Sequence, residues 1–415
     1  MRIVYICQYF KTRSTPGSTR AYEQARRLVE LGHEVDVVTS DTTAVQASMS
    51  WRVTLEDGIR VHRLPAPYSN AMPYRRRIWA FLQFAVGASV MATRLGGDVV
   101  FASSTPLTAA IPGIVAARLR GARFVFEVRD LWPEIPVELG ALRNPAAVRL
   151  AYALARTAYR HADHVVALSD GMAQGVARYG YPTDRISVIP NACDLDLFAA
   201  DADAVERFRW SHPWLHERPL VVYLGTFGRV NGVGYLVRLA AEMVTIAPEV
   251  RFLLVGEGAE FPYLTRLATD LGVLNRSLFI MPSVAKREVP TLLGAATLAT
   301  SVFVPLPGLA ANSANKFFDA LAAGRPQAIN YGGWQAEILR ESGAGLVLDS
   351  HDIPLAAKDL AAGLHDEAWL ARAGAQAGRL AVDRFSRDLL FEVFARAVLG
   401  SDDRRPRAAA QNGRQ

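Results

Sequence analysis

The sequence has few cysteines and few lysines. Only Cys7 and Cys193 occur among the 415 residues, which is too few for a disulfide framework, and we interpret both as buried thiols in a reducing compartment. Of the 46 basic residues only four are lysines, so each lysine is a candidate for a specific role. The net charge of +6 is spread along the chain without the motifs of nucleic-acid-binding domains, and no nucleic acid partner is expected.

The sequence has no long uninterrupted hydrophobic run, and we do not expect a signal peptide. The longest apolar stretch, residues 78–91, is too short to span a bilayer and follows three arginines, Arg75, Arg76 and Arg77. It fits either a buried helix of an α/β domain or a surface helix whose basic collar docks on an anionic membrane. The N-terminus runs straight into a strand pattern, so we expect a cytoplasmic protein, peripheral at the inner face of the membrane if the second interpretation holds.

Short apolar segments alternate with helical patterns in both halves of the chain. Such runs, joined by helices, predict parallel sheets covered on both faces. We therefore expect an α/β protein of two tandem Rossmann-like, doubly wound domains, residues 1–200 and 201–384, with a cleft between the carboxyl ends of their sheets. The polar stretch 201–219 is interpreted as a linker. A helix at about 385–399 could cross back to the first domain, and residues 400–415 are predicted to be a disordered tail.

Three turns of the first half carry polar residues where strands end. Gly17 permits a ligand-facing turn, and Arg20 adds positive charge at the start of the next helix. Arg129 and Asp130 follow a strand, and Asp130 could deprotonate an acceptor hydroxyl or simply cap a helix. The hydroxyl of Ser104 suits either a sugar contact or an N-cap, so these turns indicate a site without proving one.

Glycine-rich turns mark the second half. One carries Gly225, Gly228 and Arg229, and another carries Gly256 and Gly258. Glycines with one arginine suit a diphosphate, although each turn alone is a weak signal. No Gly-x-Gly-x-x-Gly pattern is present, which argues against a dinucleotide cofactor.

The helical segment ANSANKFFDALAAGRP, residues 311–326, places a lysine where the helix dipole disfavours a cation. Asn312 or Ser313 is the expected N-cap, and Asn315, Lys316 and Asp319 occupy the first turns. A lysine beside free N–H groups at a helix N-terminus is typical of an anion site, so we predict that this end of the helix binds phosphate.

Taken together, the chain resembles the GT-B glycosyltransferases, most closely the retaining family 4. The resemblance rests on GHEV after the first helix, VIPNACDLDLF before residue 201 and AAGRP after the late acidic helix, and it covers roughly residues 1–395. The phrases EVRDLWPE and NKFFDALAAG resemble a bacterial subgroup that transfers sugars, often N-acetylated, to lipid-linked precursors of surface polysaccharide such as lipopolysaccharide. The resemblance implies an acceptor-binding first domain and a nucleotide-sugar-binding second domain.

The family's motifs carry over unevenly. In its E-x7-E pattern the second acid, which holds the ribose, matches Asp319, while Ala311 stands where the first glutamate would be. The basic clamp on the diphosphate would fall at Thr226 and Asn231, neither of which is basic. We therefore expect Arg229 and Lys316 to replace that charge.

The resemblance implies a UDP-sugar donor, a polyprenyl-linked acceptor and no metal or other cofactor. The family's base-reading loop matches residues 283–290, centred on Val284, and Asp130 matches the acid at its cleft. A nucleotide-sugar 2-epimerase of the same fold and a non-enzymatic anionic-polymer-binding protein are the alternatives. The predicted site residues are Asp130, Lys316 and Arg229 for catalysis, Gly17, Gly225, Gly228, Gly256, Gly258, Val284, Asn312, Ser313, Asn315 and Asp319 for the donor, and Arg20, Ser104, Arg129 and Glu134 for the acceptor.

Overall fold

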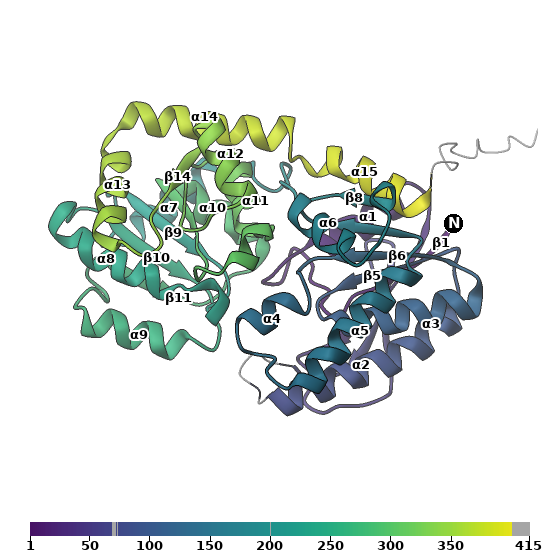
Figure 1. Ribbon diagram of the computed structural model, residues 1–415. Helices are drawn as coiled ribbons and strands as arrows, with labels where there is room; N and C mark the ends of the chain where they lie inside the picture. Colours follow the sequence, from purple (N-terminus) through teal and green to yellow (C-terminus); the bar gives the residue numbers. More distant parts are fainter. Residues whose placement is uncertain (69–71, 73, 200, 401–415) are drawn as a thin grey trace, which may run out of the picture.

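Two α/β domains lie side by side in the computed structural model, which describes residues 1–68, 72, 74–199 and 201–400 (Figure 1). Each domain has one sheet with helices on both faces. The predicted fold class is therefore confirmed. The predicted tail, residues 401–415, lies outside the described residues.

The first sheet has the strand order β3-β4-β2-β1-β5-β6-β7-β8. Its strands are β1 (Arg2–Ile6), β2 (Glu34–Asp41), β3 (Arg52–Glu56), β4 (Ile59–Pro65), β5 (Val99–Ser104), β6 (Arg123–Val128), β7 (His164–Ala167) and β8 (Ile186–Val188). All neighbours are parallel except β3 and β4, a hairpin that sequence analysis did not predict. Its two-residue turn, Asp57 and Gly58, has positive φ at both positions, as an Asp-Gly hairpin turn requires.

The first-domain helices pack on both faces of this sheet. They are α1 (Arg20–Glu30), α2 (Tyr74–Leu95), α3 (Ala110–Arg120), α4 (Glu134–Glu138), α5 (Pro145–His161) and α6 (Asp170–Ala177), with 3₁₀ turns η1 (Leu107–Ala109) and η2 (Thr183–Arg185). The central strands are mostly apolar because helices cover both faces, and β5 is buried at every position.

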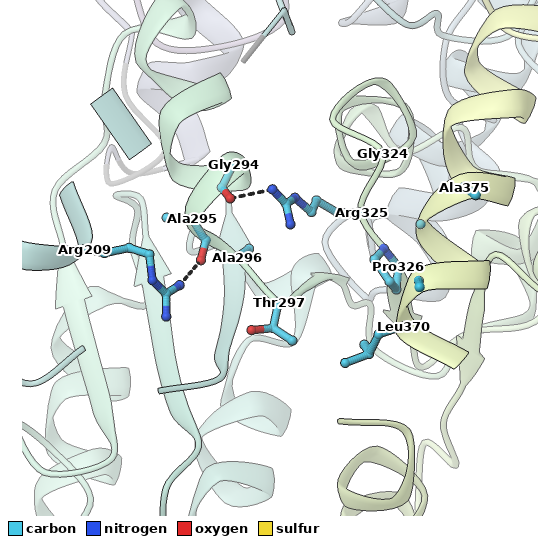
Figure 2. Close-up of a pocket in the computed structure, with 12 residues that line it drawn as sticks. Arg209, Gly294, Ala295, Ala296, Thr297, Gly324, Arg325, Pro326, Leu370 and Ala375 are labelled. Carbon is cyan, nitrogen blue, oxygen red and sulfur yellow. Dashed lines mark hydrogen bonds between the residues drawn. The ribbon is translucent and has the colours of Figure 1, made fainter. Parts of the chain in front are cut away.

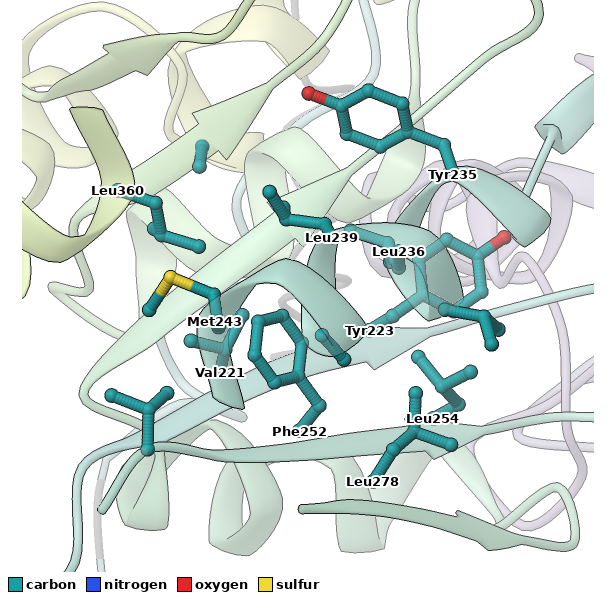
Figure 3. Close-up of a cluster of buried hydrophobic side chains, with 14 of the residues drawn as sticks. Val221, Tyr223, Tyr235, Leu236, Leu239, Met243, Phe252, Leu254, Leu278 and Leu360 are labelled. Atoms are coloured by element: carbon teal, nitrogen blue, oxygen red, sulfur yellow. The ribbon is translucent and has the colours of Figure 1, made fainter. Parts of the chain in front are cut away.

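The second sheet has the order β11-β10-β9-β12-β13-β14 and is parallel throughout. Its strands are β9 (Leu220–Leu224), β10 (Arg251–Val255), β11 (Leu278–Met281), β12 (Leu298–Ser301), β13 (Gln327–Ile329) and β14 (Gly345–Val347). Figure 3 shows one of its faces, where Tyr223, Phe252 and Leu254 of the strands meet Leu236 and Met243 of a covering helix. This packing fixes the strand ends from which the site loops leave.

The second-domain helices begin earlier than expected, because residues 201–219 are not a plain linker. These helices are α7 (Ala202–Trp210), α8 (Gly234–Ile246), α9 (Phe261–Asp270), α10 (Val289–Ala295), α11 (Asn315–Ala322), α12 (Trp334–Ser342), α13 (Ile353–His365) and α14 (Glu367–Asp383), with 3₁₀ turns η3 (Arg229–Asn231), η4 (Lys286–Glu288) and η5 (Pro307–Ala311). Helix α7 packs on α10, with Val205 and Phe208 against the core of the second domain, so the linker interpretation was wrong.

The chain crosses between the domains twice, and the two crossings lie together. Cys193 and Ser386 form a parallel β-bridge, and a buried ion pair joins Asp194 to Arg387. Beyond it, α15 (Arg387–Leu399) returns to the first domain, as Figure 1 shows, and Phe394 packs on Phe101 of β5. The last helix therefore belongs to the first domain in space.

Helix α2 is half-buried and half-exposed along its apolar length. Phe84 and its small neighbours face the core, whereas Trp79, Leu82, Val86 and Val90 face outward, with Trp79 68% exposed. Sequence analysis judged residues 78–91 too short to span a bilayer, but the helix is longer than that stretch. Residues 76–95 are long and apolar enough to cross a membrane by length and composition alone, although one face packs on α3. The side chain of Arg75 lies outside the described residues.

Candidate active site

The predicted site loops gather where both sheets reverse their strand order. In the first sheet β1 lies between β2 and β5, and in the second β9 lies between β10 and β12. Ligands of doubly wound sheets bind at the carboxyl ends of strands at such a point. The loops of the two domains meet there, because Lys286 N–H donates to Thr15 O at 3.3 Å and Ser169 Oγ donates to Ala311 O at 2.5 Å.

Lys316 reaches from α11 to the turn after β9. Its Nζ donates to Asn231 Oδ1 at 3.2 Å and lies over the rings of Tyr223 and Phe303 at 5.2 and 5.7 Å. A Cβ at Gly225 would come within 2.5 Å of Lys316 Cε, so this glycine leaves room for the lysine. The ammonium therefore lies beside Asn231, one of the two positions at which sequence analysis expected a basic clamp.

Burial lowers the pKa of Lys316 to about 8, although Asp319 on the same helix raises it. The described residues give this ammonium no carboxylate within ion-pair distance. A half-buried cation without a bound anion is stabilised by an incoming negative charge. The half-buried position of the Lys316 ammonium therefore favours the binding of an anionic ligand beside it.

The N-terminus of α11 differs from the prediction. The helix begins at Asn315 with Ala314 at the cap position and without a side-chain cap. Ser313 is buried and holds the domains together, because its Oγ accepts from Asn191 N at 3.1 Å and its carbonyl accepts from Asn191 Nδ2 at 2.6 Å. Asn312 Oδ1 accepts from Ser313 N instead of capping the helix. The capping role expected of Asn312 or Ser313 is therefore corrected. The Phe317 N–H donates to Ala314 O at 3.1 Å, so in the first turn the N–H groups of Asn315 and Lys316 are the ones open to a ligand.

The glycine-rich turns of the second domain pack directly on each other. A Cβ at Gly256 would lie 1.9 Å from Gly225 O, and one at Gly258 would lie 2.3 Å from Phe227 O. This close approach of the two backbones is by itself sufficient to require glycine at positions 256 and 258. Gly228 opens η3, and the side chain of Arg229 in that turn is exposed. The role expected of Arg229, a positive charge for the diphosphate, remains a prediction.

Asp319 is held by a lysine that sequence analysis did not select. Lys286 Nζ donates to Asp319 Oδ1 at 2.5 Å, and only 8% and 17% of the two side chains are exposed. Burial raises the pKa of Asp319 while Lys286 lowers it. Lys286 lies two residues from Val284 in the predicted base-reading loop, and its place among only four lysines was the available signal.

In the first domain, Arg129 brings two of the predicted loops together. Its N–H donates to Ser104 Oγ at 3.1 Å, and its guanidinium donates to Ser18 Oγ at 3.4 Å, next to Gly17. Burial raises the pKa of the neighbouring Asp130 to about 6, against the opposing effect of Arg129. A carboxyl with this pKa is partly protonated near neutral pH and can accept a proton from a hydroxyl.

Two predicted acceptor contacts have partners inside the protein. Arg20 is 2% exposed and donates to Glu127 Oε1 at 2.8 Å and to the carbonyls of Ile189 and Pro190. Glu134 Oε1 accepts from Tyr179 OH at 2.7 Å. The burial of Arg20 counts against direct acceptor contact, because its guanidinium joins β6 to the start of the domain crossing.

A separate pocket of about 500 Å³ lies in the second domain at the amino ends of the strands β12 and β13 (Figure 2). Its lining includes Thr297 and Pro326, which precede β12 and β13. Arg325 donates to Gly294 O at 2.6 Å and Arg209 to Ala295 O, so both cap the C-terminal carbonyls of α10. Because these guanidiniums are used on the protein and the pocket lies away from the strand carboxyl ends, we do not assign it a catalytic role.

Among the described residues no group of three or more His, Cys, Asp or Glu side chains could hold a metal ion. That catalysis needs no metal ion remains a prediction.

Two family models together match most of the chain. Residues 17–192 match the Glycosyl transferase 4-like domain, and residues 204–379 match Glycosyl transferases group 1. The chain belongs to the group 1, family 4 glycosyltransferases. This membership makes the protein an enzyme, which removes the binding-protein alternative.

Curated relatives of this glycosyltransferase act on inositol-containing acceptors, as their names state. The chain is 27% identical to D-inositol 3-phosphate glycosyltransferase 1 of Catenulispora acidiphila over 85% of this chain and 84% of that protein. It is also 27% identical to the GDP-mannose-dependent alpha-(1-6)-phosphatidylinositol monomannoside mannosyltransferase of Mycolicibacterium smegmatis, over 61% and 64% of the two chains. Identification with the surface-polysaccharide subgroup therefore remains a proposal.

Solved structures of the same fold cover nearly the whole glycosyltransferase chain. Sucrose-phosphate synthase from Thermosynechococcus elongatus aligns with a TM-score of 0.74 at 18% identity, over 95% and 97% of the chains. WaaG, a glycosyltransferase involved in lipopolysaccharide biosynthesis, aligns with a TM-score of 0.72 at 16% identity, over 96% and 100%. At these identities the comparison shows the shared GT-B fold.

Proposed function

We propose that this glycosyltransferase moves a hexose or N-acetylhexosamine from a UDP-sugar to a lipid-linked acceptor, with retention at the anomeric carbon. The observation that carries the proposal is the ammonium of Lys316, held beside Gly225 and Asn231 at the uncapped N-terminus of α11. A cation and free helix N–H groups in one place suit a diphosphate leaving group.

The residues supply charge stabilisation without a protein nucleophile. The acceptor hydroxyl forms its bond to the anomeric carbon on the face that the diphosphate leaves, and the bond from that carbon to the phosphate oxygen breaks. The hydroxyl proton passes to the departing phosphate, with Asp130 as the alternative acceptor. Lys316 and the α11 N–H groups stabilise the charge that develops on the phosphate, an effect worth roughly 3 to 4 kcal/mol for one preorganised donor.

A lipid acceptor is supported by the exposed face of α2. Its four outward apolar residues lie along one side of the helix, and the exposed Arg76 stands near its start. Apolar side chains beside basic ones favour an anionic membrane surface, where each cation contributes about 1 kcal/mol. We therefore propose a peripheral location on the inner face of the cytoplasmic membrane.

A second acceptor class is favoured by the curated relatives, whose names specify inositol 3-phosphate or a phosphatidylinositol mannoside. The mannosyltransferase is named GDP-mannose-dependent, which makes a GDP-sugar the second candidate donor. The 2-epimerase alternative requires no acceptor and leaves the exposed face of α2 unexplained.

The test is a transfer assay with purified protein, a set of UDP- and GDP-sugars, and three acceptors: polyprenyl-linked saccharide in vesicles, phosphatidylinositol in vesicles and inositol 3-phosphate in solution. We expect transfer to the polyprenyl-linked acceptor, with the donor's anomeric configuration kept in the product by NMR. Transfer only to an inositol acceptor would replace the acceptor assignment. Donor consumption without any acceptor would favour the epimerase.

Membrane docking is tested by vesicle flotation. Arg76→Glu combined with Trp79→Ser should release the protein from anionic vesicles, because both the charge and the apolar anchor are lost. Arg266→Glu, at an exposed position of α9 in the second domain, is the control and should bind as the wild type does. Retained binding by the α2 variant would refute the proposed docking face.

A further inference from the structure

Lys286 is held in place from three directions. Its backbone N–H donates to Thr15 O of the first domain at 3.3 Å, and its Nζ donates to Asp319 Oδ1 at 2.5 Å. The same Nζ lies 5.4 Å from the centre of the Phe198 ring, in the segment that joins the domains. Only 7% of the residue is exposed, so the ammonium has little freedom to leave Asp319.

The ion pair uses one oxygen of Asp319 and leaves the other available. Oδ1 accepts from Lys286, whereas Oδ2 has no hydrogen-bond partner among the residues that the structure describes. The side chain is 17% exposed, so it is not sealed from a ligand. Ribose hydroxyls donate hydrogen bonds, and an ionised carboxylate accepts them more strongly than a neutral acid does.

We infer that Lys286 is a positioning residue for donor binding, which keeps Asp319 ionised and turned so that its free Oδ2 accepts a ribose hydroxyl. The inference rests on the proposed function, because the ribose arrives with the nucleotide sugar. It also explains a short acid at this position: aspartate has one methylene fewer than glutamate, and a fixed lysine compensates by setting its orientation.

The charges around Asp319 decide what happens when Lys286 is removed. They come from the packed elements as follows: Lys286 from η4, Asp194 and Cys193 from the domain crossing, Arg387 from α15, and Lys316 from α11 itself. Burial and Asp194 raise the pKa of Asp319, while Lys286 and Arg387 lower it. Without Lys286 the carboxyl therefore takes up a proton at a higher pH than in the wild type.

The experiment measures the Kd of UDP by calorimetry from pH 5.5 to 8 for the wild type and variants. The ratio of each variant's Kd to the wild-type Kd at the same pH cancels the titration of UDP itself. For Lys286→Met we expect a ratio of at least about tenfold, which grows by about tenfold for each pH unit below the pKa of the unpaired carboxyl. Lys286→Arg should restore most of the affinity. Arg287→Met, at an exposed position of the same turn, should stay within about twofold.

A double-variant cycle separates this role from general damage. In an Asp319→Asn background, Lys286→Met should cost little further affinity, because the two residues act on the same ribose contact. If Lys286→Met does not fold, Lys286→Gln carries the same expectations, and thermal melting identifies the folded variants.

The outcomes distinguish a failure of the role inferred for Lys286 from a failure of the proposed function. Normal UDP binding by the wild type with a pH-independent ratio near one for Lys286→Met would overturn the role of Lys286 alone. Tighter binding of UDP by Lys286→Met would also overturn the role of Lys286. The ion pair between Lys286 and Asp319 would then compete with the ribose for the carboxylate. Failure of the wild type to bind any nucleotide would overturn the proposed function itself.

Discussion

Replacing Lys316 with methionine should make the free protein more stable and the enzyme far slower. The lysine has a pKa of about 8 in the fold against 10.5 for an ordinary lysine. Because the folded pKa is lowered, the penalty for keeping the charge is fully present below pH 8 and disappears as pH rises through 8 toward 10.5. At about 1.4 kcal/mol for each pKa unit, the penalty at pH 7 is about 3 kcal/mol.

Methionine has a similar length and removes this penalty, but it also removes the hydrogen bond of the ammonium to Asn231 and its contacts with Tyr223 and Phe303. Losing the hydrogen bond and the cation–π contacts costs about 2 kcal/mol together, which leaves a net gain in unfolding free energy of about 1 kcal/mol at pH 7. Turnover should nevertheless fall by about 10²- to 10³-fold, because a preorganised charge at the leaving group is lost.

The assay is urea denaturation at pH 7 and pH 9.5, together with steady-state kinetics at pH 7. Lys358→Met is the matched control, since Lys358 is exposed on α13, and it should change neither stability nor turnover appreciably. The gain from Lys316→Met should shrink at pH 9.5. A variant less stable than the wild type at pH 7, a stability difference independent of pH, or full turnover would refute the reasoning.

Three further predictions follow from the described contacts. The kcat/KM profile should fall above about pH 8 as Lys316 loses its proton, and the alternative route, in which Asp130 takes the hydroxyl proton, adds an acidic limb near pH 6; Asp130→Asn should remove that limb, and an unchanged limb would exclude Asp130. Arg20→Met should lower the unfolding free energy by about 3 to 5 kcal/mol with little change in the acceptor KM, whereas a large rise in KM would restore its acceptor role. Gly225→Ala should cut turnover at least about tenfold because its Cβ meets the Lys316 side chain, while Gly378→Ala, which meets nothing within 4 Å, should retain full turnover.

The sequence was sufficient to predict the two parallel sheets and the strand ends at which the candidate site residues lie. Apolar strands covered on both faces leave an unambiguous pattern, and parallel strands place their following loops at one edge. This is why Ser104, Arg129 and Lys316 were found on the loops and helix at the strand ends. The hairpin β3–β4 was missed although Asp57-Gly58 is a typical hairpin turn, because β3 is largely exposed and lacks the buried run of the central strands.

What the sequence did not disclose depends on long-range contacts. Nothing local to Arg20 indicates that Glu127 lies 2.8 Å away, and without that partner an arginine beside a glycine turn is naturally interpreted as a ligand contact. Ser313 has the residue type of an N-cap, but its hydroxyl accepts from Asn191 of the domain crossing. Lys286 is selected only when its ion pair with Asp319 is seen, since pairing across 33 residues leaves no periodic signal.

Calorimetric binding of UDP, GDP and ADP to the wild type and to Lys316→Met, without added metal, tests the central claim most directly. The account predicts selective binding of UDP by the wild type, with affinity reduced at least about tenfold in the variant because a charge-assisted contact to the diphosphate is lost. A preference for GDP would keep the site and change the donor. Equal binding of UDP by both proteins, or no nucleotide binding by either, would contradict the claim that Lys316 and the start of α11 form the diphosphate site.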